Sequence, residues 1–156
     1  MTRDKMISHL LAANDVAAAA AAHGHHPFGA VLVGPDGTIL MRQGNIDTVH
    51  HAESELARRA AKAYAPDFLW SCTLVTTGEP CAMCAGTLYW ANIGRLVYGY
   101  EETQLLALTG DHEENPTMSL PSRTVLGSGQ KPIEVHGPCP EIEAELLAPH
   151  RDFWQR

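Results

Sequence analysis

The sequence predicts an α/β domain of three layers, in which helices cover both faces of a five-stranded mixed sheet. Segments with helical periodicity alternate with short apolar segments along the chain, and such alternation is typical of this architecture. The first two strand-like segments are joined by Pro35-Asp36-Gly37, a turn sequence that predicts an N-terminal hairpin and therefore a mixed sheet. A length of 156 residues suits a single domain over residues 1–156.

The first half of the chain is expected to form a helix, the hairpin and a second helix. Residues 4–23 are rich in alanine and place apolar side chains at steps of three and four, which favours a helix ending at Gly24. Residues 30–33 are all apolar and are expected to form a buried strand, with residues 38–42 as its hairpin partner. The second helix is expected over residues 52–63.

The second half of the chain continues the alternation of strands and helices. Residues 72–76 and 96–100 are expected to form the third and fourth strands, and Pro80 is expected to open a helix over residues 80–90, because proline suits a first turn. The remaining elements expected are a short helix at 102–108, a loop at 112–122, a fifth strand at 133–136 and a final helix at 140–147.

Charge and hydropathy argue against several classes of protein. Eighteen acidic side chains against 11 Lys and Arg give a net charge of −7, whereas binding to a phosphate backbone needs a basic surface, so nucleic acid is not expected as a partner. The chain has no run of 18 uncharged apolar residues, so no membrane span is expected. The N-terminal residues lack a signal-peptide pattern, and a cytoplasmic protein is expected.

Two of the four cysteines, Cys81 and Cys84, have the CxxC spacing of metal and redox motifs. At positions i and i+3 of the predicted helix, their sulfurs lie on one face of its first turn, where the helix dipole favours thiolates. His51 stands directly before the second predicted helix and can supply an imidazole. These three side chains are the predicted ligands of a zinc ion.

Two thiolates and one imidazole predict a catalytic zinc site, because catalytic sites leave the fourth position to water. Zinc lowers the pKa of such a water toward about 7, and Glu53, two residues after His51, is predicted to carry its proton. The alternatives are a redox CxxC or a structural zinc site completed by Cys72 or His50.

Several neighbouring residues have structural interpretations. Cys72 is expected to be a buried strand residue, and Cys139 a small apolar or surface thiol. Glu79 is expected to pack the zinc loop, with a substrate contact as the alternative, and Trp90 is expected to lie in the core or at a subunit interface.

The two motifs, His51-Ala52-Glu53 and Glu79–Gly86 (EPCAMCAG), stand 30 positions apart from His51 to Cys81 and form the H-x-E and P-C-x-x-C signature of zinc-dependent base deaminases. They resemble the cytidine deaminase superfamily, in particular its bacterial guanine deaminases, cytosine deaminases and tRNA adenosine deaminases. The resemblance extends over residues 27–100, including Pro27-Phe28-Gly29-Ala30 and Leu88-Tyr89-Trp90-Ala91. It implies a cytidine-deaminase-like fold.

The resemblance also implies residues that bind the substrate. An asparagine after the hairpin hydrogen-bonds the base in the family, and backbone groups beside the zinc ligands hold the reacting water and the amine. C-terminal aromatic or acidic residues close the pocket. The implied side-chain contacts come from Asn45, Phe28, Asp111, Phe153 and Trp154, and the implied main-chain contacts come from Ala52 and Cys81.

The function implied is hydrolytic deamination of a free aminated heterocycle, with guanine as the first candidate because Leu88-Tyr89-Trp90-Ala91 and the aromatic C-terminus are similar to guanine deaminases. Cytosine, a triazine or a pterin remains an alternative, since the loop after Asn45 and residues 110–123 differ from guanine deaminases. Deamination of tRNA adenosine and a non-catalytic zinc module are further alternatives. The expected partners are a small heterocyclic amine and a second copy of the chain in a homodimer or larger homo-oligomer.

Overall fold

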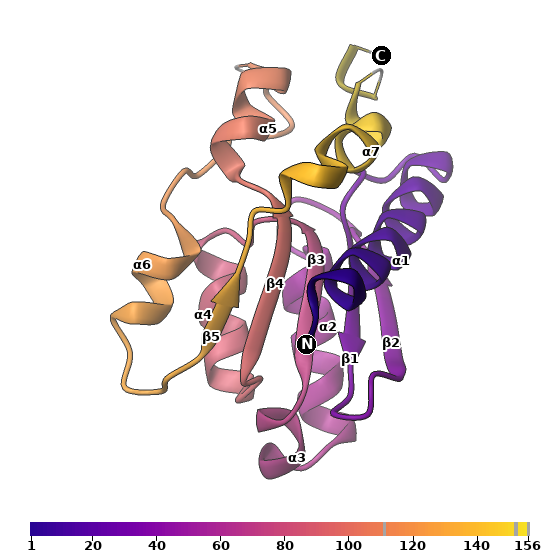
Figure 1. Ribbon diagram of the computed structural model, residues 1–156. Coiled ribbons are helices and arrows are strands. Elements are labelled where there is room, and N and C mark those ends of the chain that lie inside the picture. The colour runs from indigo at the N-terminus through magenta and orange to yellow at the C-terminus, as the bar shows by residue number, and fades with distance from the viewer. Residues whose placement is uncertain (111, 152, 156) are drawn as a thin grey trace.

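The sheet is five-stranded and mixed, as the sequence predicts. The computed structural model describes residues 1–110, 112–151 and 153–155, and orders the strands β2-β1-β3-β4-β5 (Figure 1). β1 pairs antiparallel with β2 and with β3, whereas β3, β4 and β5 are parallel neighbours. The strands are β1 (Gly29–Val33), β2 (Ile39–Gly44), β3 (Thr73–Gly78), β4 (Arg95–Tyr100) and β5 (Glu134–His136).

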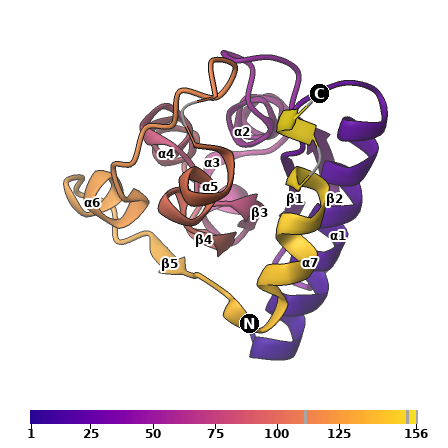
Figure 2. The same cartoon turned by 90° about the horizontal axis from the view of Figure 1, so that it is seen from above.

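Helices cover both faces of the sheet, so the three-layer prediction is confirmed (Figure 2). α1 and α7 lie on one face, and α2 and α4 pack side by side on the other, with α6 against α4. The α-helices are α1 (Arg3–Ala22), α2 (Ala52–Ala63), α3 (Pro66–Trp70), α4 (Ala82–Ala91), α5 (Glu102–Thr109), α6 (Ser122–Gly127) and α7 (Glu143–Leu147). Three short 3-10 helices follow β5, at Pro140–Ile142, Ala148–His150 and Phe153–Gln155.

The central strands are buried on both sides and divide the apolar interior into two cores. Leu32 and Leu74 belong to the core under α2 and α4, while Val31 and Val75 belong to the core under α1 and α7. Successive side chains of a strand point to opposite faces, so strands covered on both faces are apolar throughout. α1 approaches β1 so closely that a Cβ added to Gly29 would lie 2.3 Å from a backbone oxygen of α1.

The structure corrects several predicted boundaries. Pro80 does not open a helix: the Glu79 N–H donates to the Tyr100 carbonyl at 2.8 Å, so the backbone stays strand-like there and α4 begins at Ala82. α3 and α6 are short helices that the sequence reasoning missed, and α6 takes Ser122 from the predicted loop. The final helix predicted over 140–147 is divided into a 3-10 turn and α7.

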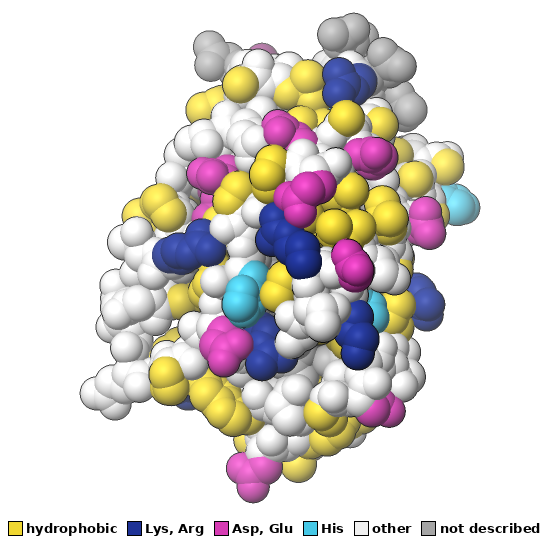
Figure 3. Space-filling model, in the orientation of Figure 1, with side chains coloured by type: hydrophobic (Ala, Val, Ile, Leu, Met, Phe, Trp, Pro, Cys, Tyr) yellow, Lys and Arg dark blue, Asp and Glu magenta, His cyan; other side chains and the backbone are white. Residues whose placement is uncertain are grey.

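Among the described residues, no helix is both long enough and apolar enough to cross a bilayer. On the face seen in Figure 3, basic and acidic side chains are interspersed with apolar ones.

Candidate active site

The two sequence motifs meet where the N-termini of α2 and α4 lie side by side. His51 is the N-cap residue of α2 and Cys81 the N-cap residue of α4, both with extended backbone. Cys84 follows one turn into α4, where its side chain is fully buried. Because the two helices pack together on one face of the sheet, their first residues come together although they are 30 positions apart.

The three predicted ligands form a compact cluster that fits zinc. The Nδ1 atom of His51 lies 3.6 Å from the Cys81 sulfur and 3.5 Å from the Cys84 sulfur, and the sulfurs are 3.7 Å apart. Tetrahedral zinc with its usual bond lengths requires nitrogen–sulfur separations of about 3.6 Å and a sulfur–sulfur separation of about 3.8 Å. Among the described residues these three are the only group of this kind close enough to hold a metal ion.

The electrostatics of the cluster favour a thiolate at Cys81. Hydrogen bonding with the Cys84 sulfur, followed by hydrogen bonding with His51, lowers the pKa of Cys81 to about 4 although burial opposes this. The hydrogen bond with Cys81 raises the pKa of His51 to about 9. Hydrogen bonding with Cys81, and then burial, raises the pKa of Cys84, so the pair shares one proton that a bound cation would displace.

Glu53 lies beside the cluster on the first turn of α2 and is almost fully buried. Burial is the main cause that raises the pKa of its carboxyl group. The Oε2 atom is 3.8 Å from the Cys84 sulfur, and the Oε1 atom is 3.0 Å from the Thr76 hydroxyl on β3. A buried carboxyl group of raised pKa next to a metal cluster is suited to take up and return protons.

The Thr76 hydroxyl touches two acceptors, which bears on the protonation of Glu53. It lies 3.0 Å from Glu53 Oε1 and 2.9 Å from the carbonyl oxygen of Gly78. It can donate to an ionised Glu53, or accept from a protonated Glu53 while donating to Gly78. Thr76 therefore holds the carboxyl group in place in either protonation state.

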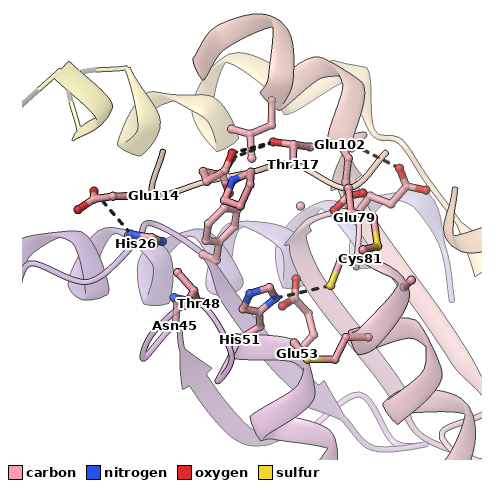
Figure 4. Close-up of a pocket in the computed structure, with 18 of the residues that line it drawn as sticks. His26, Asn45, Thr48, His51, Glu53, Glu79, Cys81, Glu102, Glu114 and Thr117 are labelled. Carbon is pink, nitrogen blue, oxygen red and sulfur yellow. Dashed lines mark hydrogen bonds and ion pairs between the residues drawn. The ribbon is translucent and has the colours of Figure 1, made fainter. Parts of the chain in front are cut away.

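A cavity of about 340 Å³ opens over the cluster and Glu53 (Figure 4). Phe28 and Asn45, two predicted binding residues, line it. Asn45 is buried, and its Nδ2 donates to the Asp47 carbonyl at 3.1 Å. Ala52 is buried but does not line the cavity, and Asp111 lies outside the described residues.

The C-terminal aromatic residues lie behind the cavity wall. Phe153 and Trp154 are buried and are not among the residues that line the cavity, so the direct contact expected of them is not seen. The Trp154 ring packs edge-on against His26, which does line the cavity, at 4.7 Å between ring centroids. Its indole N–H donates to Nδ1 of His150, whose Nε2 is 2.6 Å from the Tyr100 hydroxyl.

Sequence reasoning missed several residues that line the cavity. Glu102 begins α5, and burial, with the charges of Cys81, Glu79 and Glu53, raises its pKa to about 8. Glu114, which lines the cavity together with His26, lies 4.0 Å from that side chain. Glu102 could have been predicted from the sequence, because it is an acidic residue just after a strand that ends near the metal motif. The missed lining residues include His26, Thr48, Glu102, Leu105, Glu114, Asn115, Pro116, Thr117 and Met118.

Other residues near the motifs have structural contacts. His50 bonds the Asp47 carboxylate at 2.9 Å and is not part of the cluster. Glu79 accepts from the backbone and hydroxyl of Ser122, which agrees with a role in packing. Cys72 is buried and is not in the metal cluster, so the four-ligand structural site is not seen among the described residues. The Trp90 side chain is 80% exposed, which excludes it from the core.

Comparison with known proteins identifies the family. Residues 3–100 match the cytidine and deoxycytidylate deaminase zinc-binding region. A "Probable cytosine deaminase" of Schizosaccharomyces pombe is 37% identical over 155 residues, covering 97% of this chain and 93% of that protein. The guanine deaminase of Bacillus subtilis is 40% identical over 81 residues, covering 49% of this chain and 52% of that protein.

The fold agrees with this match. A solved structure of a deaminase acting on A34 of transfer RNA superposes with a TM-score of 0.66 at 27% identity, covering 92% of this chain and 99% of that chain. The family match spans both motifs, and its zinc-binding description agrees with the cluster of His51, Cys81 and Cys84. The chain therefore belongs to the cytidine and deoxycytidylate deaminase family and is a zinc-dependent deaminase, a hydrolase that acts on C–N bonds in cyclic amidines.

Proposed function

We propose that this deaminase converts a free nucleobase to its oxo product and ammonia, with guanine as the substrate and xanthine as the product. One observation carries the proposal: a buried carboxyl group, Glu53, lies beside a three-ligand zinc cluster at the floor of a cavity of about 340 Å³. Cavities of this size suit small ligands. His51, Cys81 and Cys84 are the proposed zinc ligands, and Glu53 is the proposed catalytic residue.

The reaction replaces a ring C–NH₂ group by C=O at the expense of one water. Bound zinc supplies the Lewis acidity that makes a water nucleophilic near neutral pH. Glu53 takes one proton from the water and passes it to the ring nitrogen next to the attacked carbon. Glu53 then transfers the second proton to the departing amino group, so that ammonia leaves as the carbon–oxygen double bond forms.

Residues of the chain orient the base and limit its access to water. Phe28 flanks the cavity from the start of β1 and is held edge-on by His150 at 5.0 Å. Asn45 is fixed through the Asp47 carbonyl and can present its side-chain oxygen to an N–H group of the base. Phe153 and Trp154 act from behind, through His26 and His150.

The charges that line the cavity favour guanine. Besides Glu53, the carboxyl groups of Glu102 and Glu114 line it, and carboxyl oxygens accept hydrogen bonds. Guanine offers two ring N–H groups in addition to the amino group that leaves, whereas cytosine offers one ring N–H.

Cytosine is the second candidate, because the relative named a probable cytosine deaminase aligns over nearly the whole of both chains. Transfer RNA is disfavoured by the net charge of −7 and by the mixture of charges on the face shown in Figure 3. A homodimer or larger homo-oligomer stays a prediction, which sedimentation velocity of the purified protein would check.

Ammonia release from a panel of heterocycles tests the proposal. The zinc-loaded protein is assayed at one concentration with guanine, cytosine, adenine, ammeline and the corresponding nucleosides. Release from guanine without release from cytosine supports the proposal, and release from cytosine or ammeline alone contradicts the choice of base. Glu53→Gln should keep one zinc per chain and lose activity by several orders of magnitude, since the Glu53 carboxyl group lies directly against the cluster, 3.8 Å from the Cys84 sulfur.

A further inference from the structure

Glu102 is held at the cavity wall by a buried hydrogen-bond network that does not include its own carboxyl group. Its backbone N–H donates to Glu79 Oε1 at 3.3 Å. The other oxygen of Glu79 accepts from the N–H and the hydroxyl of Ser122, both at 2.9 Å. The start of α5 is thereby tied to the start of α6, which fixes the point where the Glu102 side chain begins.

The carboxyl group of Glu102 has a buried oxygen without a partner. Oε2 is one of two buried side-chain atoms in the described residues that make no hydrogen bond, and the other, Asn14 Oδ1, is on α1. Buried polar atoms in folded proteins are almost always paired, so an unpaired one on a side chain that lines a binding cavity indicates a ligand that supplies the missing group.

α5 does not need this side chain for its own stability. Glu101 is the N-cap residue of α5 and forms a reciprocal capping box with Gln104, so the first turn is capped without Glu102. The side chain of Glu102 instead lines the cavity that Glu53 lines from α2 (Figure 4).

The geometry points to Glu102 as a specificity-determining residue that accepts a hydrogen bond from a ring N–H of the bound heterocycle. The inference rests on the proposed function, because it takes the substrate to be a base with such a group. A neutral N–H donor suits the site, because Oε2 of Glu102 is buried and has no hydrogen-bond partner among the described residues. A substrate without the N–H leaves the oxygen unpaired and binds more weakly.

Two substitutions separate recognition from a structural role. Glu102→Leu keeps the bulk of the side chain and removes the acceptor, whereas Glu102→Ala also opens space. Each variant is assayed with guanine and with 1-, 7- and 9-methylguanine, in which one ring N–H is replaced by a methyl group. Glu101→Gln is the matched control, because it removes the adjacent charge while its amide oxygen can still cap α5. Zinc content is measured for every protein.

We expect Glu102→Leu to raise KM for guanine about tenfold or more with a smaller change in kcat, at unchanged zinc content. We expect Glu102→Ala to accept one methylguanine that the wild type rejects, because the methyl group occupies the space of the carboxyl group. The inference is overturned if guanine kinetics change less than threefold, or if Glu102→Ala lowers all four substrates equally. If the wild type is active on cytosine but not on guanine, only the choice of base is overturned. The role of Glu102 is then tested in the same way, by comparing the kinetics of each variant with cytosine and with 1-methylcytosine. A wild type inactive on both overturns the proposed function and the inference with it.

Discussion

Removing the Thr76 hydroxyl should slow the reaction without displacing the metal. Thr76→Val is close to isosteric at a fully buried position of β3, and it deletes the group that lies 3.0 Å from Glu53 Oε1. A hydrogen bond to a charged group contributes about 1.5–3 kcal/mol. If this contribution is expressed when Glu53 changes protonation state, kcat should fall by about 10- to 100-fold, since each 1.4 kcal/mol is a factor of ten.

The assay is steady-state ammonia release with the best substrate of the panel, together with zinc content and the unfolding midpoint. Thr73→Val is the matched control: it makes the same change on the same strand, at a buried residue that pairs with Arg95 at the end of β3 remote from the cluster. We expect the control to retain kcat within about threefold, as is usual for changes away from a catalytic contact.

The reasoning is refuted if Thr76→Val retains full kcat with one zinc per chain, because Glu53 would then need no partner on β3. It is also refuted if both valine variants lose activity equally, because the loss would then come from the strand and not from the hydroxyl.

Three further predictions concern the metal and stability. Cys84→Ala should abolish stoichiometric zinc binding, measured by metal analysis; a variant that still holds one zinc per chain would contradict the ligand set. Gly29→Ala should lower the free energy of unfolding by about 2 kcal/mol or more, because its Cβ would meet the backbone of α1. Gly86→Ala has open space on α4 and should raise the free energy of unfolding by about 0.5–1 kcal/mol, since glycine is less favourable than alanine inside a helix. Denaturant titrations measure both changes. Burial lowers the pKa of His150 to about 3, so below about pH 6.5 the unfolded chain binds a proton that the folded chain does not, and stability falls with falling pH. The free energy of unfolding should decrease by about 2 kcal/mol from pH 7 to pH 5. His150→Gln should reduce this pH dependence, whereas His23→Gln, at an exposed position, should not.

Local patterns were sufficient to predict the zinc cluster. Cys81 and Cys84 are one turn apart, and His51 and Glu53 are two residues apart, so each pair is positioned by the start of a single helix. Once α2 and α4 are neighbours on one face of the sheet, the two pairs must meet. The alternation of strands and helices and the hairpin turn predicted that layering for the same reason, since each depends on residues close together in the chain.

Contacts between distant segments decided what the sequence reasoning missed. α6 has six residues, and its first residue, Ser122, is held by Glu79, 43 positions earlier. Short helices depend on such contacts, because their own hydrogen bonds are too few to stabilise them. Pro80 remained outside α4 because β4 holds the preceding backbone in an extended conformation.

The cavity also combines features that local sequence patterns determine with features that depend on contacts between distant segments. The sequence by itself determined the reaction class, because the metal ligands and the proton carrier are set by residue type and helical spacing. Only the tertiary structure placed Trp154 behind His26 and brought Glu102 to the wall with an unpaired oxygen. These positions depend on how the end of the chain packs on β4 and how α5 is tied to α6, and burial and unpaired hydrogen-bonding groups are properties of packing that no local sequence pattern encodes.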